Sequence, residues 1–379
     1  MIPLFATLAK LWRRRETETE GLVFRLHYTL TVIVLMAFCI VISSKQAIGG
    51  PIDCEVATNA MDVNMINTFC YVRFTTNVYG GPQYANRPNL GPHGDHPPGD
   101  GEHHYYQWVW LVLLLQSVCF YFPHYLWKRF ESNRISSIVS SDMQYFVDDP
   151  NKRHQKIAQV VHFLRSTIGR NDGLAIEYYG CEFLAFCVVC GQILFNHHFL
   201  DKGFITFGMD QVKWWIADPS ILQDPMEMLF PLLSKCRFDK FGSSGGRVEL
   251  DALCVLSLNI LNQKMFLFIW FWFYFLAIIT GFTLIYRLIL MTCPLIRYYA
   301  LGSDIQSITD CQNRYKRFVC GLPLGDWFIL LLLKDNTEPI IFDQIIEQLH
   351  QSCEVGGDFA TNSYDIENND NSIQCSSKM

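Results

Sequence analysis

The strongest constraint on the fold of this chain is a set of four long apolar runs. Each is close to the ~20 residues that an α-helix needs to cross a hydrocarbon core of ~30 Å. The third run gives the weakest signal for a membrane span, because it contains the charged residues Glu177 and Glu182. The pattern predicts an all-α polytopic membrane protein with four transmembrane helices. The spans are Leu22–Ser43, Trp108–Trp127 (105–127 with its aromatic approach), Ala175–Phe195 and Met265–Met291.

The composition supports extensive contact with lipid. Of the 379 residues, 50% are hydrophobic and 17% are charged, whereas a soluble domain carries about 25% charged residues. The net charge of -6 gives no reason to expect nucleic acid as a partner. We find no nucleophile triad, phosphate loop or metal motif, so we expect neither an enzyme nor a bound cofactor. Cys187 and Cys190 form a CxxC within an apolar run, which favours buried, inert thiols.

Basic residues beside the spans predict the orientation, because loops rich in Lys and Arg stay in the cytosol. They flank the same side of all four spans, whereas Lys45 stands alone on the other side. The N-terminal segment 1–21, the 128–174 loop, a folded helical domain at 292–350 and a disordered acidic tail at 351–379 are then cytoplasmic. The loops 44–104 and 196–264 are then extracellular. The basic residues are Lys10, Arg13–Arg15, Lys128, Arg129, Arg134, Arg165, Arg170, Arg287 and Arg297.

The two extracellular loops hold two cysteines each. They are Cys54 and Cys70 in the first loop, and Cys236 and Cys254 in the second. An even set in an oxidising compartment predicts disulfides, but four cysteines allow three pairings and the spacing does not choose among them. A bridge stabilises a loop by about 2–4 kcal/mol, and a loop fixed in this way loses less freedom when it docks onto a partner.

The string Tyr105-Tyr106-Gln107-Trp108-Val109 enters the second span, where amphipathic rings suit the boundary between headgroups and hydrocarbon. It resembles the signature of the innexins, the gap-junction proteins of invertebrates. Other family-like strings run in the family's order over about residues 1–350. They are Phe24–Tyr28, Pro51–Cys54, Asn67–Cys70, Phe204–Gly208, Phe241–Gly245 and Gly325–Phe328.

The resemblance implies a plasma-membrane gap-junction subunit. Homomeric or heteromeric rings, octameric in the family, would form hemichannels that dock between cells and pass ions and small metabolites. By similarity to the related pannexins, the disulfides would be nested, with Cys54 joined to Cys254 and Cys70 to Cys236. The alternative is an undocked, pannexin-like pore to the outside. Neither extracellular loop holds an Asn-x-Ser/Thr acceptor, and the absence of a glycan there favours docking.

Three further features each carry two interpretations. The N-terminal segment forms a short amphipathic helix that either enters the pore, where Phe5 and Leu8 narrow it and Lys10 sets its charge, or lies on the membrane surface. Glu182 is either a functional intramembrane carboxylate or a structural partner of another helix, for example through Gln192. The four histidines of 93–104 either have a function, in binding zinc or in sensing acid, or belong to a solvated loop.

Two local expectations concern the ends of the spans. Arg25 and His27 lie in the first turns of the first span, where they can reach the interface. Pro123 near the end of the second span removes one helix hydrogen bond and should kink that helix.

Overall fold

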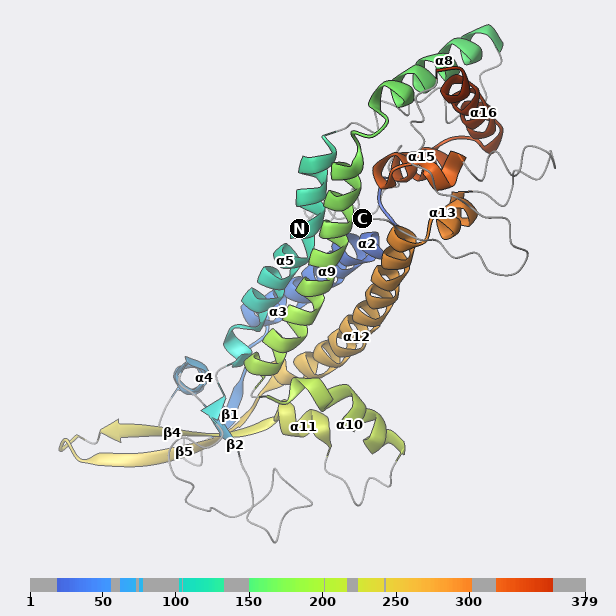
Figure 1. Cartoon of the computed structure of the whole chain (residues 1–379). Coiled ribbons are helices and arrows are strands. Elements are labelled where there is room, and N and C mark those ends of the chain that lie inside the picture. Colours follow the sequence, from blue (N-terminus) through green and yellow to red (C-terminus); the bar gives the residue numbers. More distant parts are fainter. Residues whose placement is uncertain are drawn as a thin grey trace. The chain divides into compact units, whose positions relative to one another are not determined.

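The computed structural model forms two compact units, which are described separately (Figure 1). The first unit comprises Glu20–Trp127 and Gly180–Ile285, and the second comprises Lys128–Tyr179 and the chain from Tyr286 on, together with Thr19. The structure describes residues 19–55, 62–72, 75–77, 102–103, 105–132, 150–200, 202–216, 224–241, 243–301 and 318–356.

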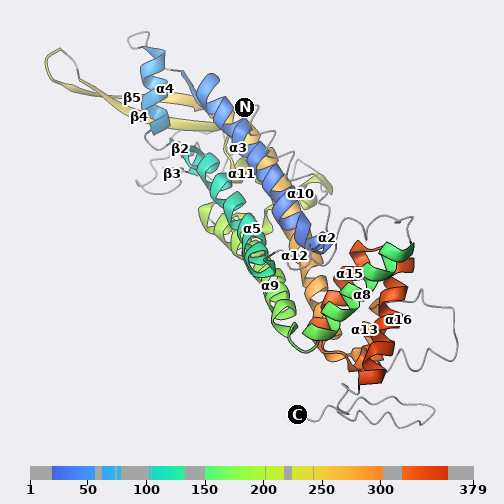
Figure 2. The same ribbon diagram turned by 90° about the horizontal axis from the view of Figure 1, so that it is seen from above.

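Four helices are long and apolar enough to cross a membrane, as the sequence predicts. They are Leu22–Ile48, α5 (Val109–Glu131), α9 (Asp172–Phe199) and α12 (Ser257–Thr292). Within the first unit their segments run alongside one another (Figure 2). The helix α5 contains Pro123 without ending there.

The first span is not a uniform α-helix. It consists of α2 (Leu22–Arg25), the π-helical turn η1 (Leu26–Leu30) and α3 (Thr31–Ile48). The Thr31 hydroxyl donates to the carbonyl of Leu26 at 3.0 Å, within the widened turn. Single π-helical turns inside α-helices occur frequently at functional sites, and this one contains the buried residues His27, Tyr28 and Thr29.

The spans keep large apolar side chains on their surface. On α12 these lie at Phe268, Phe271, Phe275, Ile278 and Phe282, a spacing that follows one face of a helix. Phe282 is 68% exposed in the isolated chain. A continuous apolar face of this kind requires lipid or another protein surface to cover it.

The loops between the spans form a five-stranded antiparallel sheet in the order β1-β5-β4-β2-β3. This sheet was not among the elements expected from the sequence. Its centre is a long hairpin whose turn includes Gly245, with a φ of 78° that favours glycine. The strands are β1 (Asp53–Glu55), β2 (Thr75–Asn77), β3 (Glu102–His103), β4 (Leu233–Phe241) and β5 (Arg247–Val255).

Four short helices complete the first unit. These are α4 (Val63–Val72), the 3-10 turn η3 (Tyr105–Gln107), α10 (Phe204–Ile216) and α11 (Pro225–Leu229). One hydrophobic core runs from the spans, at Leu35, Phe120 and Phe273, to the sheet at Cys236 and Cys254. The sheet therefore shares its core with the membrane helices of the same unit.

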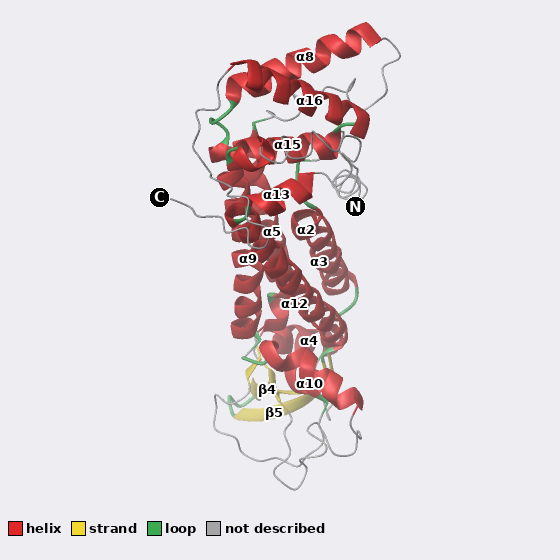
Figure 3. Ribbon diagram, turned by 45° about the vertical axis from the view of Figure 1, so that its right-hand side comes forward, coloured by secondary structure: helices red, strands yellow, loops and turns green. Residues whose placement is uncertain are grey.

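The second unit is helical, in agreement with the expectation for the segments assigned to the cytosol. It contains α8 (Pro150–Thr167), the start of α9, α13 (Pro294–Leu301), α15 (Leu324–Asn336) and α16 (Pro339–Gly356) (Figure 3). The short apolar run Trp327–Leu333 lies in α15 as a largely buried helix, as predicted. The helix α16 continues to Gly356, beyond the predicted start of the tail at 351.

Candidate functional site

Two disulfides join the two loops that the sequence places outside the cell. Cys54 is bonded to Cys254, its direct partner in the register of β1 and β5. Cys70 on α4 is bonded to Cys236 on β4. This is the nested pairing that the resemblance implied. All four cysteines are buried, at 8% exposure or less, so the bridges lie inside the unit and not on its surface.

The helix α4 is also attached to the sheet by a hydrogen bond. The side-chain oxygen of Asn67 accepts from the backbone N–H of Cys54 at 2.9 Å. Ile66 and Cys70 point into the core from the same helix. The family-like strings Pro51–Cys54 and Asn67–Cys70 therefore form one contact between two neighbouring parts of the first loop. A fixed α4 in turn presents its exposed Met65 and Phe69 at defined positions.

The signature Tyr105–Val109 joins the start of the second span to both loops. The Tyr105 hydroxyl donates to the carbonyl of Leu229 at 3.1 Å and accepts from the Asn259 amide at 3.3 Å. Its ring meets the ring of Phe230 edge to face at 5.6 Å. Tyr105, the first residue of η3, thereby connects this turn to the end of α11 and the start of α12.

The next two signature residues contact the end of α4. The Tyr106 hydroxyl donates to the carbonyl of Tyr71 at 3.5 Å, and the Gln107 amide donates to the same carbonyl and to that of Val72. The Gln46 amide donates to the Tyr71 hydroxyl at 3.0 Å. Burial, followed by the neighbouring Tyr106, raises the pKa of the Tyr71 hydroxyl above its ordinary value, so the hydroxyl stays neutral at physiological pH.

The interpretation of these aromatics as rings at the lipid boundary is wrong for two of them. Tyr105 and Tyr106 are 6% and 1% exposed, because protein carbonyls satisfy their hydroxyls in place of headgroups. Trp108 is 55% exposed at the start of α5 and is the ring that suits the interface. Val109 is fully buried.

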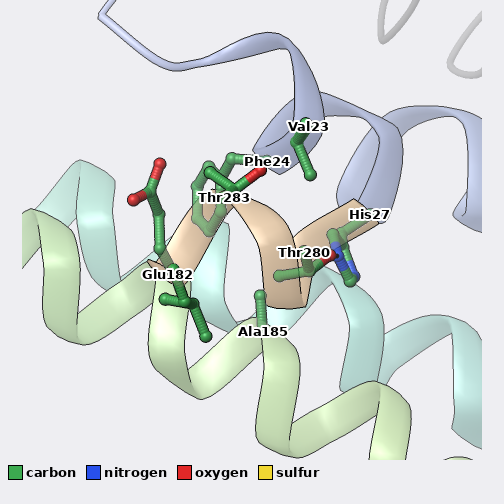
Figure 4. A pocket seen from close by; sticks show the side chains of 8 residues that line it. Val23, Phe24, His27, Glu182, Ala185, Thr280 and Thr283 are labelled. Atoms are coloured by element: carbon green, nitrogen blue, oxygen red, sulfur yellow. Dashed lines mark hydrogen bonds between the residues drawn. The ribbon is translucent and has the colours of Figure 1, made fainter. Parts of the chain in front are cut away.

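A small cleft, lined by both apolar and polar side chains, lies between three spans of the first unit (Figure 4). His27 from η1 contacts the Thr280 hydroxyl of α12 through Nε2 at 2.7 Å. The Thr280 hydroxyl donates its one proton to the carbonyl of Leu276 at 2.6 Å. Its oxygen must therefore accept the hydrogen bond from His27, which places the imidazole proton on Nε2. His27 is 1% exposed. The expectation that it reaches the interface is therefore wrong, because a partner inside the bundle satisfies it.

Glu182 of α9 lines the same cleft and is 3% exposed. In Figure 4 its carboxylate lies near Phe24 and Thr283. Gln192, the partner considered from the sequence, lies on the same helix ten residues further on, roughly 15 Å along the axis at 1.5 Å per residue. It is therefore not the partner of Glu182.

A buried hydrogen bond between two side-chain amides joins the second and third spans. The Gln116 amide of α5 donates to the side-chain oxygen of Asn196 in α9 at 2.6 Å.

A second cluster, in the second unit, is formed by the string Gly325–Phe328 at the start of α15. Gly325 donates from its backbone to the Asp172 carboxylate at 2.7 Å. The Asp326 carboxylate accepts from the backbone of Gly169 and from the Asn171 amide, both at 2.7 Å. Each carboxylate thus accepts from the partner segment, which ties the turn before α9 to the start of α15.

The other residues of the string complete the junction. The Trp327 indole donates to the carbonyl of Arg297 in α13 at 3.0 Å. The ring of Phe328 stacks on Tyr178 of α9 at 5.1 Å. Burial raises the pKa of Asp326 above its ordinary value, with a smaller contribution from Asp172, although the bonds from Gly169 and Asn171 oppose the shift. We refer to Gly169–Asp172 and Gly325–Phe328 together as the turn junction.

Among the described residues, the one cluster with metal-ligand geometry contains Cys54, Cys70 and Cys254, whose ligand atoms lie within 4.8 Å of one another. All three are in disulfides and offer no thiolate. In the CxxC, Cys187 is exposed and Cys190 is half-buried, so the expectation of two buried thiols is wrong for Cys187. Phe5, Leu8, Lys10 and most of the histidine-rich segment 93–104 lie outside the described residues.

Comparisons with known proteins agree with this arrangement. A family model described as Innexin matches residues 20–353. The chain is 34% identical over 354 residues to innexin shaking-B of Drosophila melanogaster, covering 92% of this chain and 94% of that protein. It is 35% identical to innexin inx2 of the same species, covering 94% and 97%, and 35% identical to innexin inx2 of Schistocerca americana, covering 93% and 99%. The chain therefore belongs to the innexin family and is a multi-pass gap-junction protein of the plasma membrane.

Proposed function

We propose that this chain is one subunit of a ring-shaped hemichannel that docks onto a hemichannel of an adjacent cell and passes ions and small metabolites. One observation carries the proposal. Both disulfides connect the first loop to the second, so the two loops form a single sheet with a shared core. A surface that meets another protein gains affinity when its loops are ordered before binding.

The orientation belongs to the same proposal. The segment 1–21, the loop 128–174 and the chain from 292 on lie in the cytosol, and 44–104 and 196–264 lie outside. Two independent features support it. Basic residues gather beside the spans on one side, and both disulfides lie in the loops of the opposite side, as an oxidising exterior favours.

The pore is formed by several copies, eight by resemblance to the family, and these are identical or mixed with other innexins. The apolar face of α12 supports association with lipid or with neighbouring subunits, because one copy leaves it uncovered. Phe5, Leu8 and Lys10 line the pore mouth in this proposal. The assembly acts by passing solutes.

Paired-cell recording tests the proposal. Two cells that both express the chain should show a junctional current, and a cell paired with a non-expressing cell should not. A current across the membrane of single cells, without any junctional current, would identify the undocked pore instead and overturn docking. Deletion of residues 2–12 should change the unitary conductance, and an unchanged conductance would contradict the role of Phe5, Leu8 and Lys10.

A further inference from the structure

The helix α10 has three distinct faces. Phe204, Phe207, Gly208 and Gln211 are buried against the rest of the first unit. A second face, made by Ile205, Met209, Val212 and Ile216, has the four-three-four spacing of one helical stripe. Three of its members are exposed apolar side chains, at 38% for Ile205, 53% for Met209 and 81% for Ile216. We call these four residues the α10 stripe.

The start of α10 is held against the apolar part of α12. The Trp270 indole and the Tyr274 hydroxyl both donate to the carbonyl of Ile205, at 3.1 and 3.2 Å. A Cβ on Gly208 would lie 2.1 Å from the ring of Trp270, so the backbone of α10 rests directly on that ring. Figures 1 and 3 place α10 beside the same end of α12.

These contacts indicate how deep α10 lies. Lys264 is the last charged residue of α12 before its long apolar run. Trp270 and Tyr274 follow it by six and ten residues, roughly 9 and 15 Å along the helix axis, and their side chains lean back toward the start of the helix. The start of α10 therefore lies at or beyond the level where α12 becomes apolar.

The third face of α10 is polar and carries no net charge. The Lys213 ammonium contacts the Asp210 carboxylate at 3.1 Å. Hydrogen bonds from Thr206 and Lys213 hold the pKa of Asp210 below its ordinary value, so this carboxylate is ionised at neutral pH. A helix with one apolar face, one neutral polar face and an exposed Trp215 at its end has the features of an interfacial helix.

We propose that α10 lies in the lipid interface on the side of the membrane that carries the sheet, with the α10 stripe inserted among the acyl chains. Because the polar face is neutral, the helix takes zwitterionic lipid and does not require anionic headgroups. The α10 stripe thus contacts the bilayer of the cell in which the subunit itself is embedded. The helix thereby fixes the height of the sheet above the membrane.

Photocrosslinking of the full-length chain in phosphatidylcholine nanodiscs tests this. A benzophenone amino acid replaces Met209 or Ile216 in the stripe, Thr206 on the polar face, or Phe282 on the exposed face of α12 as the lipid-facing reference. After illumination, phosphatidylcholine adducts should form at Met209 and Ile216 as they do at Phe282, several-fold more than at Thr206.

Three results would overturn the proposal. They are crosslinks that join two copies of the chain in place of lipid adducts, equal adducts at Thr206 and the stripe, or adducts at Phe282 alone. Met209 and Ile216 are both exposed, so neither replacement disturbs the core, and the second site serves if the first fails to assemble. Repeating the Ile216 experiment with half phosphatidylserine should leave the yield of adduct unchanged.

Discussion

Thr280 carries one of the polar contacts between the first and fourth spans; another joins the Trp272 indole to the Thr31 hydroxyl. Thr280 accepts from His27 while it donates to Leu276. Replacing it by Val keeps the shape and leaves a buried imidazole N–H without an acceptor, which costs about 1–3 kcal/mol. Thr283→Val is the matched control, because the Thr283 hydroxyl bonds the carbonyl of Ile279 in its own helix. Thermal unfolding in detergent should show a lower melting temperature for Thr280→Val, and equal losses in both variants would contradict the role of the His27 bond.

Gly325 permits a backbone contact that no other residue allows. A Cβ at this position would lie 2.1 Å from the carbonyl carbon of Asn171, and backbone on both sides cannot move aside. Gly325→Ala should therefore destabilise the second unit by about 3 kcal/mol, the upper end of overpacking. Gly173→Ala is the control, because nothing lies within 4 Å of its added Cβ. Limited proteolysis of the second unit measures the difference, and equal protection of both variants would contradict the close contact.

Asp326 gives the turn junction a dependence on pH. Its folded pKa lies above the ordinary value of 3.8, first because of burial. The folded state therefore binds this proton more tightly than the unfolded state, so stability falls as pH rises from 3.8 through the raised pKa. Asp326→Asn removes this slope, and Glu347→Gln, at an exposed position on α16, keeps it. Unfolding of the purified protein between pH 4 and 7 tests the sign. A wild-type slope that persists in Asp326→Asn would contradict the assignment.

The sequence predicted the residues of the disulfides but not, by itself, their pairing. Four cysteines on one side of the membrane admit three pairings, and the choice came from family resemblance. The hydrogen bond between His27 and Thr280 could not be predicted from the sequence, because the two residues are 253 positions apart. A polar residue near the end of a span is also usually assigned to the membrane interface. Tyr105 and Tyr106 were misplaced for a related reason. Tyrosine side chains suit the lipid boundary, but the sequence does not show that backbone carbonyls of distant residues accept hydrogen bonds from these two hydroxyls.

At the scale of elements, the attachment of α4 to β4 depends on the bridge between Cys70 and Cys236, which closes a sequence separation of 166 residues. Removing a native disulfide typically costs about 2–5 kcal/mol. The double variant Cys70→Ala with Cys236→Ala should therefore reach the cell surface in smaller amounts and lose junctional conductance beyond that reduction. Cys187→Ala, at an exposed free thiol in α9, is the control. Junctional current normalised to surface protein measures it. A normal ratio would show that docking does not need this bridge.

The spans were predictable as elements because their signal is local. About twenty apolar residues leave no other stable conformation in lipid. The sheet was not predictable from the sequence, because its outer strands are too short to form without the strands they pair with. The strands β2 and β3 have three and two residues, and β1 becomes a strand by pairing with β5 two hundred residues later. Even β5, in which Val248, Leu250, Ala252 and Cys254 recur at every second position, lay inside a segment predicted only as a loop.

At the scale of the whole molecule, the spans described in one chain do not enclose a pore. The described spans pack around a shared core and keep apolar side chains outside. In the proposed assembly, the water-filled path therefore arises between copies, and the sheets of one ring face those of another. In the proposed orientation, the exposed turn of the β4–β5 hairpin, where Phe241 is 69% exposed, lies outside the cell.

A glycan at that turn tests orientation and docking together. Phe241→Asn, followed by Gly242 and Ser243, creates an N-glycosylation acceptor. Arg165→Asn, followed by Ser166 and Thr167, creates one on α8, which we place in the cytosol. Only Phe241→Asn should gain a glycan that an endoglycosidase removes, since glycosylation occurs on the lumenal side. Glycosylation of Arg165→Asn would contradict the orientation.

The same variant separates docking from an undocked pore. A bulky glycan on the hairpin obstructs an opposing ring but leaves the spans untouched, so Phe241→Asn should lose junctional current while single-cell channel current is kept. The double variant Phe241→Asn with Ser243→Ala carries the same new side chain without the acceptor, and it should couple normally. Because the two variants differ only in the glycan, coupling that survives glycosylation would show that the hairpin turn faces away from the docked partner. Coupling lost in both variants would instead assign the effect to the Phe241 side chain.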